Sequence, residues 1–416
     1  MKILLTSHGS TGDLFPVIAL GRALRAAGHV VDFASAPLYR SEIERAGLGF
    51  RRLPPNWKKE IFAECMRALD REKHPILLLR RIYRSGLSFT EELIQTLQEY
   101  IPGYDMVLGS YVFPQYKELC DRHNVPFGLV TFCHSVVPQK DRPPDGIFPL
   151  PRGLGWGSRL WNRFWWKFSD RLIVLVVNHV LRDIRKKTGV SPLRSFLARP
   201  AELCLVGVSP GLMAPSVISP PYQFTGYLRW QSEERRDLDE KILAFTQGER
   251  VPVFTFGSVT FDHIPEIMGR LAQHWPEGQK LILQSGWAGL STDSRGEDIL
   301  VVGAMSHDQL FRHAELVVHH GGAGTTASVL HAGIPHLIIP HFGDQFFWGK
   351  EVCRLGVGVT LAKKKWPEKL FPAVRMLRKS PDIQKRAKER QKTLAQENGP
   401  ATAVRAIEEF AQKRTP

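Results

Sequence analysis

Three short segments bring together residue types that could do chemistry on a phosphorylated or hydroxylated ligand. They read GSTGD, HHGGAGTT and FGDQFFWG, at residues 9–13, 319–326 and 342–349. Each follows a short apolar run and precedes a more helical pattern, which predicts a loop leading from a strand into a helix. Glycines in such loops expose backbone N–H groups, and the carboxylates, histidines and amide supply proton acceptors and hydrogen-bonding groups.

The segment 319–326 is predicted to bind a diphosphate. A Gly-rich turn at a helix start exposes several N–H donors and adds the partial positive charge of the helix. We expect the helix to begin near Thr325 and Thr326, with Thr325 capping it or donating its hydroxyl to an anion. His320 adds a neutral or cationic N–H at the same place, whereas His319, one residue earlier on the strand, should face the other side and pack. The absence of a lysine excludes a Walker A loop, and a plain glycine turn with a core histidine is the alternative.

The segment 342–349 places Asp344 and Gln345 side by side after the next predicted strand. A carboxylate only accepts hydrogen bonds, whereas an amide both donates and accepts them. Such a pair can therefore bind adjacent hydroxyls of a sugar ring. A turn-forming Asp followed by an exposed Gln is the alternative.

The elements that must position these loops alternate between strand and helix. A helix is predicted at residues 14–27. Strands are predicted at 2–8, 29–35, 105–110, 126–132, 251–256, 280–286, 299–305, 315–320 and 336–340. Strands separated by helices indicate doubly wound parallel α/β sheets.

Length and a Pro-rich stretch indicate two domains. The chain has 416 residues, long for one domain and sufficient for two. The stretch 213–232 has the composition of a linker, so we place the domains at 1–215 and 216–398. Residues 399–416 then form an amphipathic helix that is expected to pack back on the N-terminal domain.

Composition limits the classes of partner and compartment. Lys and Arg number 56 against 41 Asp and Glu, a net charge of +15 spread over several regions. No nucleic-acid-binding motif accompanies it, so anionic metabolites or lipid surfaces are the expected partners and nucleic acid is not. The five cysteines form no Cys-x-x-Cys pair, which favours a reducing compartment. The first apolar run is too short for a signal peptide, and no run reaches transmembrane length, so we predict a cytoplasmic protein.

Taken together, the motifs resemble the GT-B glycosyltransferases of family 1, the UDP-glycosyltransferase superfamily. The resemblance is to the branch with sterol and lipid glucosyltransferases and the bacterial enzymes that glycosylate antibiotic aglycones. It rests, in the family's order, on GSTGDLFPVIALGRALRAAGH (9–29), FTGYLRW (224–230), FTFGS (254–258), LQSGWAGL (283–290), VVHHGGAGTT (317–326) and FGDQFFWG (342–349). It implies two Rossmann-like domains facing across a cleft, with the nucleotide sugar bound by the C-terminal domain and the acceptor by the N-terminal domain.

The resemblance also implies roles for single residues in donor binding. His320 would hydrogen-bond the donor phosphates. The phosphate-binding loop would be formed by Gly322, Gly324 and Thr325. The hexose hydroxyls would be bound by Asp344 and Gln345. Ser258 would lie on a loop facing the diphosphate, and Trp287 would border the nucleoside, with a core Trp as the alternative.

Asp13 stands where many relatives have a catalytic histidine. The resemblance implies that it takes the proton of the acceptor hydroxyl. It is also predicted to be the N-cap of helix 14–27, where the helix dipole would keep it ionised and weakly basic. Gly12 and His134 are expected beside the acceptor, and His8 is expected to pack.

The implied activity is a metal-independent, inverting transfer of a hexose, in the first place glucose, from a UDP-sugar to a hydroxyl of a hydrophobic acceptor. Sterols, polyketides, flavonoids and lipid alcohols all remain open as acceptors. No Asp-x-Asp metal motif occurs, and no cofactor is expected. The aromatic ring that stacks on the base in plant-type relatives is missing from VGAMSHDQL (302–310), so TDP remains possible beside UDP. Two alternatives are a nucleotide-sugar 2-epimerase of the same fold and a non-catalytic basic protein that binds membranes or polyanions.

The segment 156–187 combines eight Lys or Arg with two Asp and four Trp, in helical spacing. One interpretation is peripheral contact with the inner face of a membrane. The other is that its apolar face covers the acceptor cleft and its charges are solvated. A monomer is expected.

Overall fold

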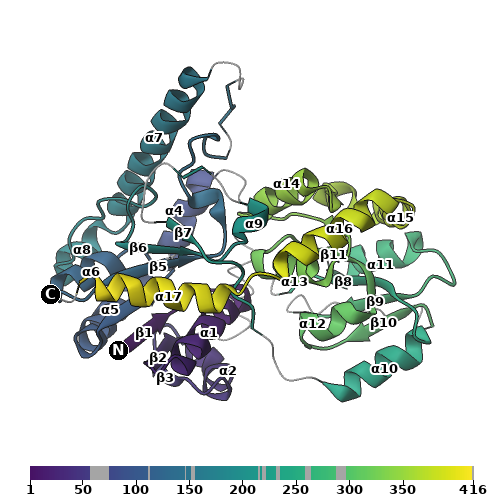
Figure 1. Ribbon diagram of the computed structural model, residues 1–416, viewed down its shortest axis with the longest axis horizontal. Coiled ribbons are helices and arrows are strands. Elements are labelled where there is room, and N and C mark those ends of the chain that lie inside the picture. Colours follow the sequence, from purple (N-terminus) through teal and green to yellow (C-terminus); the bar gives the residue numbers. More distant parts are fainter. Residues whose placement is uncertain are drawn as a thin grey trace. The chain divides into compact units, whose positions relative to one another are not determined.

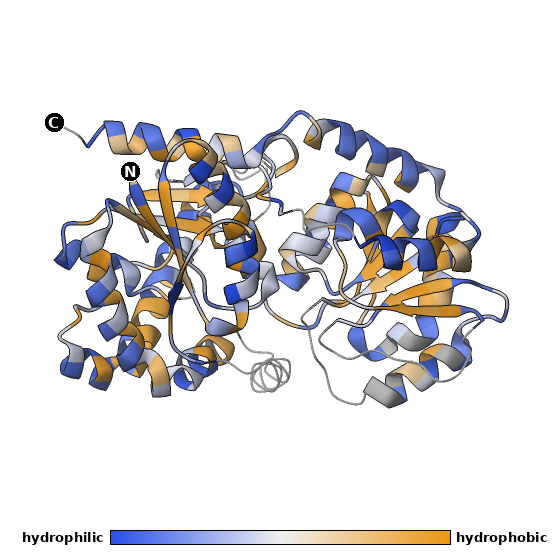
Figure 2. Ribbon diagram, turned by 90° about the horizontal axis from the view of Figure 1, so that it is seen from below, coloured by the Kyte–Doolittle hydropathy of each residue, from blue (hydrophilic) through white to orange (hydrophobic). Residues whose placement is uncertain are grey.

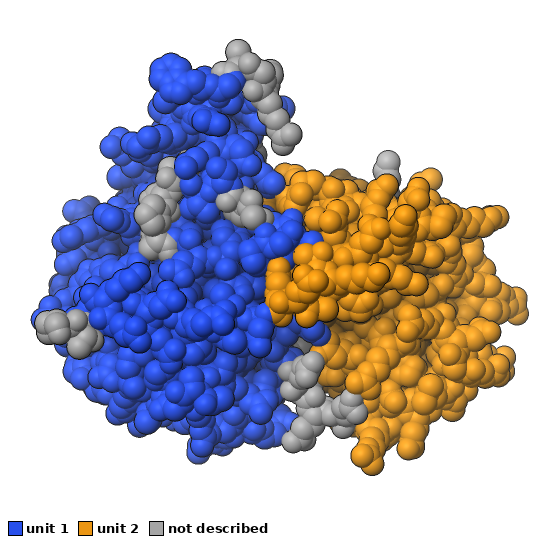
Figure 3. Space-filling model, in the orientation of Figure 1, with its two compact units in different colours: residues 1–59, 73–230, 398–416 blue, residues 60–72, 231–397 orange. Residues whose placement is uncertain are grey.

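The computed structural model describes residues 1–56, 75–110, 113–145, 147–150, 155–213, 216–217, 222–230, 235–257, 264–286 and 297–414. The chain forms two compact units, shown in different colours in Figure 3. Unit 1 comprises residues 1–59, 73–230 and 398–416, and unit 2 comprises residues 60–72 and 231–397. No helix in the described part of the chain is long and apolar enough to cross a membrane.

Unit 1 alternates strands with helices (Figure 1). Its strands are β1 (Lys2–Thr6), β2 (Val30–Ser35), β3 (Gly49–Arg52), β4 (Met106–Gly109), β5 (Phe127–Thr131), β6 (Leu203–Val206) and β7 (Tyr222–Phe224). Its α-helices are α1 (Thr11–Ala26), α2 (Arg40–Arg45), α4 (Pro75–Ser85), α5 (Leu87–Tyr100), α6 (Tyr116–Arg122), α7 (Trp156–Val180), α8 (Arg182–Thr188), α9 (Pro210–Met213) and α17 (Gly399–Gln412). Short 3-10 turns are η1 (Pro37–Tyr39), η2 (Ile101–Gly103) and η3 (His134–Val136).

The seven strands of unit 1 form one parallel sheet in the order β3-β2-β1-β4-β5-β6-β7. Helices cover both faces of such a sheet, so its central strands are continuous apolar runs rather than alternating ones. All five residues of β5 are buried, and so are four of the five in β1. The strand order reverses between β1 and β4, which makes that position the topological switch point of the sheet.

Unit 2 repeats this architecture with a shorter sheet. Its strands are β8 (Val251–Thr255), β9 (Leu281–Gln284), β10 (Ile299–Val302), β11 (Ala314–His319), β12 (His336–Ile338) and β13 (Gly358–Thr360). Its helices are α10 (Arg236–Thr246), α11 (Ile264–His274), α12 (His307–Leu310), α13 (Ala323–Ala332), α14 (Gln345–Leu355), α15 (Trp366–Arg378) and α16 (Pro381–Leu394), with 3-10 turns η5 (Phe311–His313) and η6 (Lys363–Lys365).

The six strands of unit 2 are parallel in the order β10-β9-β8-β11-β12-β13. Counted from the start of the unit this is the order 3-2-1-4-5-6 of a Rossmann sheet, with its switch point between β8 and β11. Figure 2 shows the strands of both units as hydrophobic and most helices as two-sided, as expected for helices that cover a buried sheet. Two doubly wound α/β domains, the predicted fold class, are therefore confirmed.

The division between the units falls after Trp230, whereas the sequence placed it between residues 215 and 216. The reason is β7, which pairs with β6 and extends the sheet of unit 1. The terminal helix α17 belongs to unit 1, although it follows unit 2 in the sequence. Glu408 of α17 accepts a hydrogen bond from the ring of His29, just before β2, over 3.2 Å.

Candidate functional site

Two of the three loops singled out in the sequence lie at the switch points of the two sheets. The segment 7–10 leaves β1, the strand beside the reversal in unit 1. The segment 320–322 leaves β11, the strand beside the reversal in unit 2. Ligands of open parallel sheets bind outside the carboxyl ends of the strands at such points. Each unit therefore offers its own candidate site.

In unit 1 the carboxylate of Asp13 is held by the start of α1. The helix begins at Thr11 with Ser10 as its N-cap, three residues earlier than the sequence suggested. Asp13 is consequently the third residue of the helix, and the prediction that it is the N-cap is wrong. Its carboxylate accepts a hydrogen bond from the backbone N–H of Ser10 over 3.0 Å, and the Ser10 hydroxyl accepts one from the N–H of Gly12 over 3.3 Å. This capping box fixes the orientation of the carboxylate.

Burial makes Asp13 a better base than its place at a helix N-terminus implies. Desolvation raises its pKa to about 6, against smaller lowering contributions from the hydrogen bonds of Ser10. The expectation of a weakly basic, fully ionised carboxylate is therefore corrected. A pKa near the working pH is the value at which a carboxylate is both ionised and able to accept a proton.

The backbone before Asp13 is shaped to admit that carboxylate. Gly9 has φ of +137°, and a Cβ at this position would overlap the carboxylate of Asp13. The hydroxyl of Tyr39 donates a hydrogen bond of 2.8 Å to the carbonyl of Gly9 and so secures this backbone from the side of η1. Neither Gly9 nor Tyr39 was expected from the sequence, where Gly9 stood out only as part of a glycine-rich turn.

The other residues predicted for unit 1 differ in exposure. Gly12 is exposed on the first turn of α1. His134 is only 2% exposed, and its ring packs edge-on against Phe224 of β7 at 6.3 Å between centroids. His8 packs, as expected: its Nε2 lies 2.6 Å from the hydroxyl of Tyr116, and burial lowers its pKa to about 4.

In unit 2 a pair of histidines organises the turn after β11. The N–H of Gly321 donates to Nδ1 of His319 over 3.1 Å, so that nitrogen is unprotonated. The proton of His319 therefore lies on Nε2, which is 3.1 Å from Nδ1 of His336 on β12. His319 is fully buried, as expected of the histidine that was predicted to pack. Burial lowers the pKa of His319 well below its usual value and that of His336 to about 3, so both stay neutral.

His320 lies in the glycine turns at the switch point. Its ring is close to Gly322 and Gly257, because a Cβ on Gly322 would overlap Nε2 and one on Gly257 would lie 3.4 Å from Cε1. Burial, with smaller contributions from His341 and His307, lowers its pKa to about 3, so it is neutral. Its Nδ1 is buried and has no hydrogen-bond partner among the residues that the structure describes. A neutral imidazole with a nitrogen still to be satisfied suits a phosphate oxygen or hydroxyl.

The helix after the turn starts earlier than predicted. Gly322 is the N-cap of α13 and Ala323 its first residue, so Thr325 lies within the first turn and does not cap it. The first-turn N–H groups of Ala323, Gly324 and Thr325 have no intrahelical acceptors and mark the positive end of the helix. A Cβ on Gly324 would meet no atom, which leaves open space over this turn. The loop can thus present N–H groups to an anion.

Asp344 and Gln345 stand where β12 leads into α14. Asp344 is the N-cap of α14, and Gln345 is its first residue. The side-chain oxygen of Gln345 accepts hydrogen bonds from the N–H of His341 over 2.8 Å and of Phe342 over 3.3 Å. Because that oxygen is engaged, the group that Gln345 can offer to a ligand is its NH₂. The exposed Gln considered as an alternative does not occur, since the residue is 4% exposed.

Two predicted donor-binding residues, Ser258 and Trp287, lie outside the described residues. Their neighbours Gly257 and Gly286 are described, with φ of +57° and +55°. A Cβ on Gly286 would overlap the carbonyl oxygen of Gly257, so the turns after β8 and β9 touch through their glycines. Neither glycine was singled out from the sequence, although each directly follows a strand-like run in FTFGS and LQSGW.

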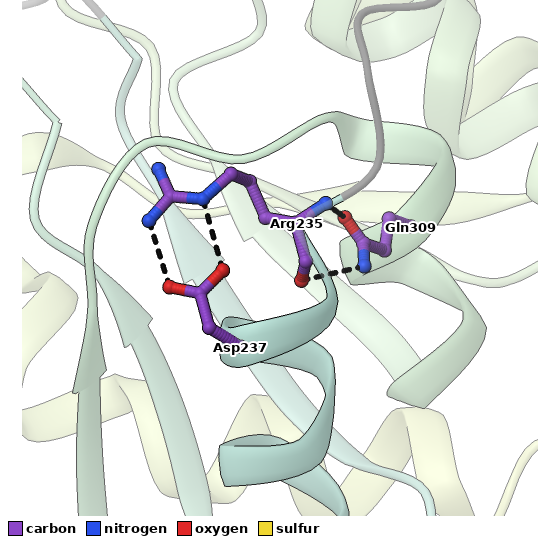
Figure 4. A network of polar contacts seen from close by, with 3 residues as sticks. All are labelled: Arg235, Asp237 and Gln309. Atoms are coloured by element: carbon purple, nitrogen blue, oxygen red, sulfur yellow. Dashed lines mark hydrogen bonds and ion pairs between the residues drawn. The ribbon is translucent and has the colours of Figure 1, made fainter.

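The segment VGAMSHDQL is fixed by its glutamine. Gln309 accepts from the N–H of Arg235 and donates to the carbonyl of the same residue, both over 2.9 Å (Figure 4). The side chain of Arg235 is in turn held by Asp237, at the start of α10, over 2.8 and 3.0 Å. The ring of His307 stacks on Phe311 at 4.8 Å between centroids. Among the residues that the structure describes, no group of three or more His, Cys, Asp and Glu side chains could hold a metal ion.

Known proteins match the chain over its whole length. Residues 3–112 match the glycosyltransferase family 28 N-terminal domain. Residues 290–410 match the erythromycin biosynthesis protein CIII-like, C-terminal domain. The O-mycaminosyltylonolide 6-deoxyallosyltransferase of Streptomyces fradiae is 27% identical over 438 residues, covering 100% of this chain and 99% of that protein.

A second relative is longer than this chain. The sterol 3-beta-glucosyltransferase of Saccharomyces cerevisiae (strain YJM789) is 27% identical over 428 residues, which cover 98% of this chain and 35% of that protein. The chain thus spans about a third of its length. Among solved structures, the glycosyltransferase SsfS6 of Streptomyces sp. SF2575 in complex with thymidine diphosphate superposes with a TM-score of 0.66 at 20% identity, covering 98% of this chain and 99% of that one.

The two Rossmann sheets and these matches together define the class of protein. The chain belongs to the GT-B glycosyltransferases, in the group that includes sterol glucosyltransferases and antibiotic glycosyltransferases. It is therefore an enzyme, a transferase of sugars.

Proposed function

We propose that the enzyme transfers a hexose, in the first place glucose, from a UDP-sugar to a hydroxyl of a hydrophobic acceptor, with inversion at the anomeric carbon and without a metal. The observation on which the proposal depends most is Asp13, a carboxylate fixed by a capping box at the switch point of unit 1, with a pKa of about 6. An inverting transfer needs a base of this strength to take the acceptor's proton.

The donor side of the proposal rests on unit 2. The neutral ring of His320 and the first-turn N–H groups of α13 suit two phosphates, and the Asp344–Gln345 pair suits the hydroxyls of a hexose. Relatives named as a sterol 3-beta-glucosyltransferase and as an O-mycaminosyltylonolide 6-deoxyallosyltransferase support a hydrophobic acceptor. SsfS6 binds thymidine diphosphate, so TDP-sugars belong in any donor screen beside UDP-sugars.

In the proposed reaction, Asp13 accepts the proton of the acceptor hydroxyl while its oxygen forms a bond to the anomeric carbon. The bond between that carbon and the diphosphate oxygen breaks, and UDP leaves with the electron pair. N–H groups of the α13 turn stabilise the charge that develops on the leaving diphosphate. An α-linked donor then gives a β-glycoside, and Asp13 returns the proton to solvent.

The variant Asp13→Asn tests the role of the base. Asparagine keeps an oxygen that can accept from Ser10 but cannot take a proton, so we expect transfer to fall by about 10²–10⁴-fold. The affinity for UDP, measured by calorimetry, should remain unchanged, because UDP is assigned to unit 2. Asp105→Asn is the matched control: this carboxylate also accepts a backbone hydrogen bond, from Lys2 over 2.7 Å, but at the opposite edge of the same sheet. Full activity of Asp13→Asn would overturn the assignment.

The products distinguish transfer from other nucleotide-sugar chemistry. Donor and a panel of sterol, polyketide, flavonoid and lipid alcohols are incubated with the enzyme and analysed by mass spectrometry, and the anomeric configuration is read by NMR. Incubation with UDP-sugar alone should leave the sugar unchanged; an epimer formed without acceptor would contradict the proposed reaction. We further propose that the enzyme is a cytoplasmic monomer that needs no cofactor.

A further inference from the structure

The long helix α7 exposes an apolar stripe that nothing in the described chain covers. Figure 1 shows α7 projecting from the rest of unit 1. Its buried face packs Trp166 and Val177 against Tyr83 of α4 and the segment 193–197. The exposed face is different: large apolar side chains stand in solvent there, with fractional exposures of 76% for Trp156, 47% for Leu160, 56% for Phe164, 47% for Phe168 and 67% for Leu175.

The spacing of these residues makes them one surface. Trp156, Leu160, Phe164 and Phe168 are four residues apart, so they lie along one face of the helix. The rings of Phe164 and Phe168 stack at 6.1 Å, and both meet Trp165 edge-on at 5.5 Å. The aromatic part of the stripe is therefore preorganised. Exposed apolar patches of this kind mark interaction sites rather than ordinary surface.

Basic side chains accompany the stripe, and no exposed acid on α7 offsets them. Arg159, Arg163, Lys167 and Arg171 are all exposed and repeat with the same four-residue spacing. The single acid of α7, Asp170, is buried and accepts hydrogen bonds from the N–H groups of Phe196 and Leu197 over 2.7 and 2.6 Å.

The elements beside α7 do not reverse the positive charge of its exposed face. The neighbouring helix α4 contributes three arginines, at 80, 81 and 84, and no acid. Trp161 and Trp166 of α7 donate hydrogen bonds to the carbonyls of Phe148 and Arg142 in the preceding loop. The charges of that loop cancel, with two bases and two acids at 140–145. Phe148 at its end is 89% exposed and adds to the apolar surface.

We propose that α7 docks on the surface of an anionic lipid bilayer, with the aromatic stripe inserted among the headgroups and the flanking Arg and Lys side chains at the lipid phosphates. A helix with an aromatic face and a basic flank is the form that binds in the plane of such an interface. A second copy of the chain fits poorly, because a symmetric contact would bring the arginines of one copy against those of the other. The inference concerns unit 1 alone and does not depend on the identity of donor or acceptor.

Flotation with lipid vesicles tests the proposal. Wild-type protein should float with vesicles of phosphatidylglycerol and phosphatidylcholine at low salt, should bind vesicles of phosphatidylcholine alone far more weakly, and should be partly released by high salt. Phe164→Ser combined with Phe168→Ser should weaken binding by roughly tenfold or more, because two apolar side chains no longer enter the interface. Arg163→Glu combined with Lys167→Glu should weaken it by a similar factor.

A matched charge control separates this surface from the general positive charge of the protein. Lys385→Glu combined with Lys388→Glu makes the same change of charge on α16, which is also basic and exposed at these positions. That variant should bind as wild type does. Circular dichroism and thermal unfolding confirm that each variant is folded.

Three outcomes would overturn the proposal. They are failure of wild type to bind anionic vesicles, unchanged binding by the double Phe variant, and equal loss of binding by the α16 control. A wild-type dimer in sedimentation that the double Phe variant converts to monomer, without vesicle binding by either, would assign the stripe to self-association instead.

Discussion

The carboxyl edges of the two sheets carry opposite chemistry on the same architecture. At the switch point of unit 1 stands an acid whose pKa is raised by burial, Asp13 at about 6. At that of unit 2 stand histidines whose pKa values are lowered by burial, with His320 and His336 both at about 3. The same strand order thus presents a proton acceptor in one unit and a neutral set of N–H donors in the other.

The difference follows from the turns rather than from the sheets. In unit 1 the turn after β1 uses one glycine of positive φ, Gly9, to admit a carboxylate that caps the helix from its third position. In unit 2 three turns pack glycine against histidine or backbone: Gly286 and Gly322 leave no room for a Cβ without moving a neighbour, and a Cβ on Gly257 would touch the ring of His320 at 3.4 Å. Close approach of backbones suits an extended anion, whereas a single fixed carboxylate suits one proton. Fold alone would not have assigned these roles.

The largest effect expected from this contrast is a difference in acid stability between the units. Three histidines of unit 2 stay neutral in the folded unit because burial lowers their pKa values: His319, His320 and His336. In the unfolded chain they have their usual pKa of 6.5, so below that pH they bind protons there. Unfolding then takes up protons, so the stability of unit 2 is lost as the pH falls from 6.5 toward 4, by roughly 1–4 kcal/mol over the first one and a half units.

Unit 1 should respond in the opposite direction over the same range. Burial raises the pKa of Asp13 to about 6 and that of Glu118 to about 7, so the folded unit binds these protons before the unfolded chain does. His8, lowered to about 4, offsets one of them. Between pH 7 and pH 5, unit 1 should therefore hold or gain stability.

Hydrogen exchange, mapped by mass spectrometry, tests this contrast. The protection of amides in β8 and β11 is compared with that in β1 and β5, after correction for the intrinsic exchange rate at each pH. His336→Asn should reduce the pH dependence in unit 2 by about one proton. His274→Asn, at an exposed position in the same unit, should leave it unchanged. Equal loss of protection in both units on acidification would contradict the contrast.

A pair of glycine variants tests whether unit 2 presents backbone to an anion. In Gly322→Ala the new methyl must displace the ring of His320, so nucleotide affinity should fall by about tenfold to a hundredfold. In Gly324→Ala the methyl meets open space in the protein and lies inside a helix, so thermal stability should rise by roughly 0.5–1 kcal/mol. Its affinity for UDP should nevertheless fall, because that space is assigned to phosphate. Calorimetry with UDP measures the affinity of both variants. An unchanged affinity in Gly324→Ala would show that the phosphates do not bind at the α13 turn.

Removing the charge at the switch point of unit 1 should stabilise the protein. The ionised carboxylate of Asp13 destabilises the folded unit, because burial removes part of its solvation. Asp13→Asn should therefore raise the free energy of unfolding at pH 7.5. We expect about 1–2 kcal/mol, less than the pKa shift alone implies, because the residue keeps some contact with solvent. Below about pH 3 the difference should vanish, because the carboxyl is then protonated in both folded and unfolded chains. Urea unfolding of unit 1 at the two pH values, with Asp105→Asn as control, measures it. A less stable variant at pH 7.5 would show that the capping box outweighs the burial of the charge.

The long central strands and the loops after them could be predicted from the sequence. Strands of a parallel sheet that is buried on both faces are continuous apolar runs in the sequence. All nine predicted strands overlap strands of the structure. Four strands, β3, β6, β7 and β13, were not predicted. Three of them, β3, β7 and β13, hold three or four residues at the edges of the sheets, where sequences such as GFRR and YQF have no apolar run. The fourth, β6, is an inner strand whose residues LCLV are all buried, and this apolar run was missed because it is only four residues long.

The candidate site was predictable in residue type more than in geometry. Motif glycines and charged groups pointed to the right loops, but helix starts were misplaced at both switch points, as with Ser10 and Gly322. The pattern SxxD can be recognised as a capping box only once the helix boundary is known. The raised pKa of Asp13 depends on its burial by segments that are distant in the sequence. The role of Gln345 in holding the preceding turn likewise depends on where the backbone of residues 341–342 lies.

That double use of Gln345 gives the smallest and most specific prediction. Glutamate at this position keeps an oxygen for the N–H groups of His341 and Phe342 but has no NH₂ to donate. Gln345→Glu should therefore leave thermal stability nearly unchanged and raise KM for the UDP-sugar by about three- to tenfold, the value of one hydrogen bond. Affinity for UDP without sugar should not change, because the lost donor is assigned to the hexose. Gln345→Leu, which removes both functions, should in addition lower thermal stability. If Gln345→Glu weakens UDP and UDP-sugar equally, the residue acts through the turn and not on the sugar, and the contrast between the units then rests on His320 and the glycines alone.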